Sequence, residues 1–238
     1  RVRLDARAGG GAHLRTILWS ATLLALGLWG LVLTDQDPSV AGVYLAFLSA
    51  LAVWGWIELA FLSGQITGPN RAPCPNDLPE WKRFLRAWGT IAYHELALVA
   101  VLTLLVYAAW REPNPFGLYT FALLFLARIS AKLTLFYGVP RINTEFLPSP
   151  LRHLPSHFRR RTMHRFFPVS VSLLTIASGF WIERMFAAGG PAQAVGFALV
   201  AALSLLALLE HWFMVLPLPD AKLWRWMLPA PKPTTKTL

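Results

Sequence analysis

Charged residues and cysteine are both scarce in this sequence of 238 residues. Asp, Glu, Lys and Arg make up 14% of it and hydrophobic residues 55%, whereas a typical soluble domain is about 25% charged. So few charges cannot cover the surface of a soluble globule, and the composition excludes an ordinary soluble domain. The single cysteine, Cys74, excludes an intramolecular disulfide, a CxxC pair and a zinc finger.

Motifs for nucleotide binding and for nucleophilic catalysis are also missing. The sequence contains no glycine-rich phosphate loop and no recognisable nucleophilic triad. The net charge of +10 is compatible with nucleic-acid binding. However, these charges lie in connectors between apolar blocks, not on the basic face of a soluble fold. We therefore expect a membrane protein that does not bind nucleic acid.

Six apolar blocks are long enough to cross a bilayer, which takes about 20 helical residues. Pro, Gly, Asp and Asn interrupt the chain between several of them. The predicted spans are residues 14–33, 39–64, 87–110, 115–138, 166–187 and 190–216. We expect an all-α fold, a polytopic transmembrane helical bundle that forms a single integral membrane domain over residues 1–238.

Most of the 22 Lys and Arg residues lie on one side of this predicted bundle. They gather before the first span, in the connectors 65–86 and 139–165, and in the tail 217–238, whereas the three short connectors contain only Arg111. Because basic loops stay in the cytoplasm, both ends of this chain are expected to be cytoplasmic. Residues 218–228 resemble an amphipathic segment lying on the cytoplasmic membrane surface.

Ionisable residues inside the predicted spans are costly in hydrocarbon and mark candidate functional sites. They are Glu58, His94, Glu95, Arg128, Lys132, Glu210 and His211. At about 1.5 Å per helical residue, all of them lie in the cytoplasmic half, so four helices contribute to one charged layer. Arg128 and Lys132 share a helix face, and we expect them to pair with carboxylates of neighbouring helices.

This charged layer has four interpretations. It can be a purely structural network of buried ion pairs that fixes helix packing. It can be a proton pathway, although polar residues are sparse in the outer half of the spans. It can also bind a chlorophyll-type pigment. In that case His94 or His211 would ligate the magnesium, and Arg128 or Lys132 would bind an oxygen atom.

The fourth interpretation is a metal site. Carboxylate and imidazole groups are suitable donors for iron or zinc, but HExxH and ExxH spacings are absent. The candidate ligands would be Glu58, His94, Glu95 and His211.

Several strings in this sequence resemble those of a known family. They are GPNRAPCP (68–75), TIAYHELAL (90–98), ARISAKLTLFYGVPRINTEFLPSPLRHL (127–154), FRRRTMHRFFPVSVS (158–172) and LEHWFMVLPLPDAKLWRWML (209–228). The chain resembles the photosynthetic complex assembly proteins of the PuhE type, which are encoded with the reaction-centre H subunit in purple phototrophic bacteria. Two features depart from that family: an additional first apolar helix is absent here, and Thr162 and His164 replace Pro and Asn.

The resemblance implies an integral membrane factor for assembly of the reaction centre and core light-harvesting complex in the intracytoplasmic photosynthetic membrane. The resemblance does not settle its molecular activity, and a non-enzymatic factor is our leading expectation. It implies partners among the subunits of these complexes and membrane lipids, and bacteriochlorophyll or a precursor as a possible ligand. It also implies a seventh span ahead of residue 1. Alternatives are a membrane enzyme acting on a tetrapyrrole or quinone, and a permanent accessory subunit.

The same resemblance covers all the charged residues named above and a group in the 139–165 connector. The latter residues, expected to contact partner subunits or lipid, are Asn143, Glu145, Arg159, Arg160 and Arg161. Taken without the resemblance, the arginine run and the nearby histidines His153, His157 and His164 are typical of a solvated or phospholipid-contacting face.

Overall fold

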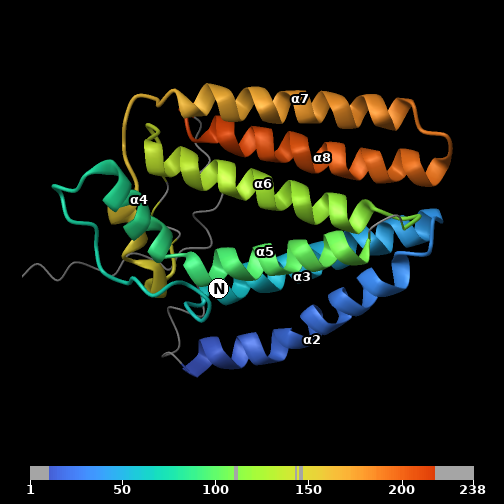
Figure 1. Ribbon diagram of the computed structural model, residues 1–238, viewed down its shortest axis with the longest axis horizontal. Helices are drawn as coiled ribbons and strands as arrows, with labels where there is room; N and C mark the ends of the chain where they lie inside the picture. Colours follow the sequence, from blue (N-terminus) through green and yellow to red (C-terminus); the bar gives the residue numbers. More distant parts are fainter. Residues whose placement is uncertain (1–10, 110–111, 143, 145–146, 218–238) are drawn as a thin grey trace, which may run out of the picture.

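The computed structural model describes residues 11–109, 112–142, 144 and 147–217, which form long helices arranged in an antiparallel bundle (Figure 1). The helices are α2 (Gly11–Thr34), α3 (Val40–Leu62), α4 (Glu80–Gly89), α5 (Ala92–Ala108), α6 (Phe116–Tyr137), α7 (Phe166–Phe186) and α8 (Pro191–Phe213), with short 3₁₀ turns η1 (Ser149–Leu151) and η2 (Leu154–His157). Over these residues the only strand-like pairing is one bridge between Val139 and Arg160.

Five of these helices are long and apolar enough to cross a membrane, or six spans result if α4 and α5 count as one bent span. The predicted helical bundle is thereby confirmed. Its outer surface carries large exposed apolar side chains such as Trp19, Trp29 and Ile176. Large apolar side chains exposed in this number fit contact with lipid rather than water.

The predicted span 87–110 differs from the structure, because the helix breaks near its start. Helix α4 ends at Gly89, α5 begins at Ala92, and the two axes differ by 71°. The carbonyl of Thr67 accepts hydrogen bonds from the backbone N–H groups of Tyr93 (2.9 Å) and His94 (3.1 Å). N–H groups in the first turn of a helix have no partner within it, so the 67–70 segment stabilises this break.

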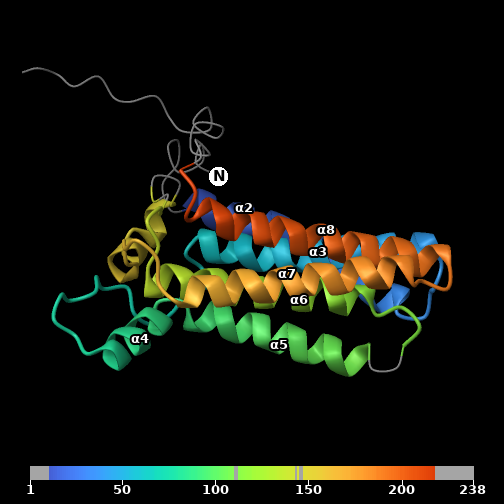
Figure 2. The ribbon, with the colours of Figure 1, turned by 90° about the horizontal axis from the view of Figure 1, so that it is seen from above.

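The short connectors all lie at one end of the bundle, called here the hairpin end (Figure 1). Helix α4, η1 and η2 lie at the opposite end, the α4 end, together with the start of α2 and the end of α8 (Figures 1 and 2). The connectors predicted to be basic and cytoplasmic, 65–86 and 139–165, are therefore at the α4 end. That this end faces the cytoplasm stays a prediction from the charge distribution.

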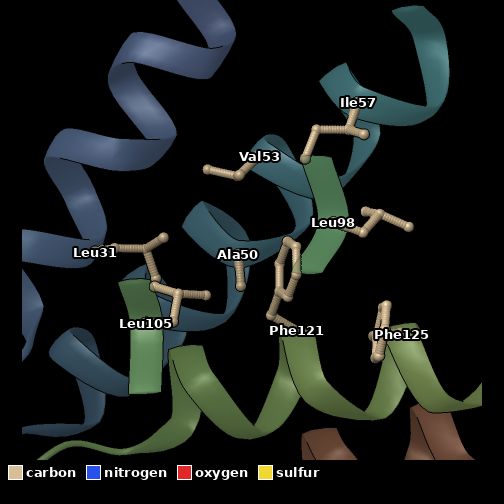
Figure 3. Close-up of a cluster of buried hydrophobic side chains, with 8 residues drawn as sticks. All are labelled: Leu31, Ala50, Val53, Ile57, Leu98, Leu105, Phe121 and Phe125. Atoms are coloured by element: carbon tan, nitrogen blue, oxygen red, sulfur yellow. The ribbon is translucent and has the colours of Figure 1, made fainter. Parts of the chain in front are cut away.

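Helices α3 and α6 occupy the centre of the bundle. Helix α3 packs against α2, α5, α6 and α8, while α7 packs mainly against α8. One core cluster joins four helices around Phe121, which points toward α3 and α5 (Figure 3). Its buried members are Leu31, Ala50, Val53, Ile57, Leu98, Leu105, Phe121 and Phe125.

Small residues allow close approach of the helices, as is common in membrane bundles. A Cβ atom on Gly30 would lie 2.2 Å from Ser49 Oγ, and one on Gly196 would lie 2.3 Å from the ring of Phe116. The α2–α3 and α6–α8 contacts therefore depend on glycine at these two positions.

Helix α4 buries one charged side chain and exposes several apolar ones. Arg83 is buried, whereas Trp81, Phe84, Leu85 and Trp88 form an exposed stripe. The Arg83 guanidinium donates hydrogen bonds of 2.8 Å to the carbonyl oxygens of Phe136 and His157. This single side chain thus ties α4 to the end of α6 and to η2.

Candidate functional site

Two interhelical ion pairs lie in the charged layer that the sequence predicts. Arg128 on α6 lies 3.1 Å from Glu58 on α3, measured between Nη2 and Oε2. One turn further along α6, Lys132 pairs with Glu95 on α5. The structure therefore joins both cations of α6 to carboxylates of neighbouring helices.

His94 lies beside these pairs but is enclosed by protein. Its side chain is fully buried, and its ring packs on Phe61 with centroids 4.5 Å apart. Nε2 is 3.6 Å from Glu58 Oε1, too long for a hydrogen bond. Within the described chain neither ring nitrogen has a hydrogen-bond partner.

His211 and Glu210 diverge, as adjacent helical residues must. His211 is fully buried; its Nδ1 lies 2.8 Å from the carbonyl of Ala207, and its Nε2 lies 2.9 Å from Ser130 Oγ. With the Nδ1 proton donated to that carbonyl, Nε2 accepts the proton of the Ser130 hydroxyl. Glu210 is exposed and joins none of the ion pairs between described residues. His211 therefore connects α8 to α6, apart from the other charges.

The donors of the metal-site interpretation are not brought together. Among the residues that the structure describes, no three His, Cys, Asp or Glu side chains are grouped so that they could hold a metal ion. Glu58 and His94 are neighbours, but Glu95 is engaged by Lys132 and His211 by Ser130. These four residues consequently do not form a shared site.

A cavity of about 660 Å³ opens at the α4 end, called here the α4-end cavity. Helices α3, α4, α5, α6 and α8 contribute to it, and so do residues 141, 142, 147, 154, 157 and 158 between α6 and α7. Most of the lining is apolar, and the aromatic contributors are Phe61, Phe84, Trp88, Phe125, Phe136, Phe158 and Phe213. The lining also contains charged residues of the predicted layer, which are Glu95, Arg128, Lys132 and Glu210.

Arg128 presents unused hydrogen-bonding capacity at the cavity wall. Its side chain is 34% exposed, and only Nη2 is engaged by Glu58. The Nε atom is buried without a hydrogen-bond partner in the described chain, so the exposed part of the side chain, not Nε, faces the cavity. Because a guanidinium carries five N–H donors, Arg128 can bind a carbonyl, ester or carboxylate oxygen while keeping its ion pair.

The structure adds one residue that the sequence did not single out. His157 at the end of η2 lines the cavity and is buried, with 2% exposure. The sequence placed it among basic residues expected on a solvated face, because the surrounding His and Arg residues hid its burial. A signal was present in Leu151 and Leu154, which become buried on the same short turns.

The arginine run docks on the end of α6 through its backbone. The N–H of Arg159 donates to the Leu135 carbonyl (3.1 Å), and the N–H of Arg161 donates to that of Val139 (3.2 Å). Arg159 also forms an ion pair with Glu80 of α4. Arg160 and Arg161 are exposed, whereas the predicted contact residues Asn143 and Glu145, like the 218–228 segment, lie outside the described residues.

Comparison with known proteins gives a family and one curated relative. Residues 2–235 match the family described as "Protein of unknown function (DUF3623)". The chain is 51% identical over 238 residues to the "Uncharacterized 30.4 kDa protein in puhA 5'region" of Rhodobacter capsulatus, covering 100% of this chain and 87% of the relative.

No solved structure matches the chain. The name of the relative places that protein in the puhA 5' region of Rhodobacter capsulatus. With nearly its whole length matched, the chain belongs to the DUF3623 family.

Proposed function

We propose that this protein is a membrane-embedded factor of the PuhE type for assembly of the photosynthetic reaction centre and core light-harvesting complex. In this proposal the α4-end cavity holds bacteriochlorophyll or a precursor during assembly. The link of the relative to the puhA region and the resemblance of the sequence motifs support the assembly role. The α4-end cavity is the observation that carries the pigment role.

The cavity fits an amphipathic ring in size and lining. Its volume of about 660 Å³ is within the range of roughly 300–1,000 Å³ usual for small-molecule sites. Aromatic side chains such as Phe84, Trp88 and Phe136 suit a flat apolar body, and Arg128 can donate to an oxygen at its edge. Bound pigment would supply the chromophore that the reaction centre and antenna require.

Of the residues predicted to bind pigment, this proposal keeps Arg128 and does not use the two histidines. His94 and His211 do not line the cavity, so the proposal does not use them as pigment ligands. Lys132 lines it but is engaged by Glu95, which leaves Arg128 as the cation with unused donors. The exposed Arg160 and Arg161 at the α4 end provide a basic surface for partner subunits or anionic lipid.

Filling the cavity tests this function. Leu133 lines it and belongs to no polar contact described above, so Leu133→Trp should occupy the space without removing an ion pair. Leu126→Trp, at a position of the same helix with 63% exposure and outside the cavity, is the matched control. Each variant would be expressed in a purple phototrophic bacterium lacking this protein.

With Leu133→Trp, we expect severalfold less reaction-centre and core-antenna absorbance in the membranes, and loss of pigment that co-purifies with the protein. Leu126→Trp should behave as wild type. Normal assembly with Leu133→Trp at equal protein levels would overturn the role of the cavity. Stoichiometric retention of the protein in mature complexes would overturn a transient role and favour a permanent subunit.

A further inference from the structure

Helix α4 carries an apolar stripe that the protein leaves about half exposed. Its four side chains are spaced by three and four residues, so they lie on one side of the helix. They are Trp81, Phe84, Leu85 and Trp88, with exposed fractions of 62%, 42%, 52% and 45%. Because a helix on a soluble protein turns such a stripe toward the core, the stripe on α4 is suited to an apolar partner outside the bundle.

The opposite side of α4 is attached to the bundle. Arg83, which lies across the helix from the stripe, is buried and donates hydrogen bonds of 2.8 Å to the carbonyl oxygens of Phe136 and His157. At one edge of the stripe, the ring of Phe84 contacts that of Phe136. These contacts fix the rotation of α4 about its axis, so most of the stripe faces outward from the end of α6.

The orientation of α4 fits a helix that lies in the membrane surface. Its axis differs by 71° from that of α5. Because spanning helices are tilted by only about 20° from the membrane normal on average, α4 lies closer to the membrane plane than to the normal. It is found beside the end of α6, beyond the start of α5 (Figures 1 and 2). With ten residues, α4 is also too short to cross the hydrocarbon core by itself.

The stripe adjoins the apolar part of the bundle at one edge. Phe84 and Trp88 share the lining of the α4-end cavity with Val99 of α5, which is itself 45% exposed. Val99 lies about 10 Å along α5 from its first residue, Ala92, toward the hairpin end. This edge of α4 therefore faces the hydrocarbon side and not the water beyond the α4 end.

The chemistry around α4 favours lipid as the partner of the stripe. Two of its four side chains are Trp, which is enriched where headgroups meet acyl chains. Glu80 at the start of α4 pairs with Arg159, and the next two residues, Arg160 and Arg161, are exposed. An apolar helix face close to exposed cations is the pattern of helices that bind the surface of a membrane with anionic lipid.

We propose that α4 is an interfacial helix whose apolar stripe inserts between the phospholipid headgroups and the upper acyl chains of the leaflet at the α4 end. Helix α5 then crosses the membrane without α4, and its 17 residues are at the short end of the range for a span. This inference goes beyond the proposed function and does not depend on what the cavity holds.

Spin labels on single cysteines test the position of α4. The full-length protein, with Cys74 and any other native cysteine replaced by Ser, would be placed in vesicles of phosphatidylcholine and phosphatidylglycerol. Leu85→Cys labels the stripe. Asp77→Cys, in the exposed loop before α4, is the water reference, and Leu126→Cys, 63% exposed in the middle of α6, is the hydrocarbon reference.

Power-saturation measurements compare collisions of each label with oxygen, which concentrates in hydrocarbon, and with a neutral nickel chelate, which stays in water. We expect the ratio of oxygen to nickel accessibility at Leu85→Cys to be severalfold above that at Asp77→Cys. It should also be severalfold below that at Leu126→Cys. This intermediate value is the one that an interfacial helix requires.

Three other outcomes would overturn the proposal. A ratio at Leu85→Cys equal to that at Asp77→Cys would place α4 in water. A ratio equal to that at Leu126→Cys would make α4 part of a bent span. Low accessibility to both reagents would mean that protein covers the stripe, and dipolar broadening of the spectrum would then identify a second copy of this chain.

Discussion

Arg128 on α6 donates a hydrogen bond of 3.1 Å from Nη2 to Glu58 Oε2 on α3. Glu58 is 16% exposed and Arg128 34%, so the pair lies at the boundary between the packed bundle and the α4-end cavity. Removing one partner of a buried pair leaves the other charge uncompensated, which costs more than removing both. This contact therefore couples the packing of α3 and α6 to the shape of the cavity.

The variants Arg128→Met and Glu58→Gln test this coupling. Each alone should lower the free energy of unfolding by about 3 kcal/mol, and the double variant should lose clearly less than the sum of the two. Thermal or denaturant unfolding in detergent measures the unfolding free energy of the wild type, the two single variants and the double variant. The exposed pair Glu183 and Arg184 is the control and should show no measurable coupling. Additive effects at Glu58 and Arg128 would contradict a working ion pair.

Close packing at Gly196 gives a second prediction. A Cβ atom there would lie 2.3 Å from the Phe116 ring, so Gly196→Ala forces α6 and α8 apart. We expect a loss of about 1–3 kcal/mol in unfolding free energy. Gly55→Ala, with no atom within 4 Å of the added Cβ, should be neutral or slightly stabilising. Equal effects at the two positions would show that helix propensity, not packing, determines the change in unfolding free energy.

Arg83 should control the order of α4 and η2. Arg83→Met removes the donors to Phe136 and His157, and charge-assisted hydrogen bonds contribute roughly 1.5–3 kcal/mol each. Amide hydrogen exchange should accelerate at least tenfold in α4 and η2 while α3 and α6 stay protected. The exposed neighbour Lys82→Met is the control. Unchanged exchange in α4 would mean that other contacts of this helix, such as the ring contact between Phe84 and Phe136, suffice to hold it.

Acid should loosen the same helix through Glu80. Burial raises the pKa of its carboxyl, but the hydrogen bond and charge of Arg159, together with Arg83, outweigh it and hold the pKa below its ordinary value. Since the folded-state pKa is depressed, the contribution is present above about pH 4.5 and is lost as pH falls through the folded-state pKa. The exchange rate of α4 amides, taken relative to the intrinsic rate of an unprotected amide at the same pH, should therefore rise below about pH 4.5.

Glu80→Gln should show the faster exchange already at pH 7, with no further change on acidification. A variant that still responded to acid in the same pH range would assign the effect to another carboxylate. Asp77 in the preceding loop provides the control substitution, Asp77→Asn, and should leave the acid response as in wild type.

Much of the fold follows from local sequence. The long apolar blocks predict the helices α2, α3, α6, α7 and α8, because each block satisfies its backbone hydrogen bonds internally whatever surrounds it. The break between α4 and α5 could not be found in this way. It depends on the Thr67 carbonyl and on the 67–70 segment, which come from a different part of the chain.

The charged layer was predictable in composition but not in pairing. The spacing of Arg128 and Lys132 places both on one face of a helix, and the cost of charge in hydrocarbon requires partners. Which carboxylate each one meets depends on how α3, α5 and α6 rotate against each other. That rotation leaves Glu210 exposed and places His211 in hydrogen-bond contact with Ser130. The order of residues along α8 alone does not determine which of these two neighbours faces the bundle.

By itself the sequence determined that the chain is a helical membrane bundle and which residues carry charge into it, because hydrophobicity and helix periodicity are local properties. Only the tertiary structure decided that the α4-end cavity exists and that His157, rather than His94 or His211, borders it. A cavity is the space left between elements that pack together, here α3, α4, α5, α6, α8 and parts of the connector between α6 and α7. Its lining is fixed by packing between residues far apart in the chain.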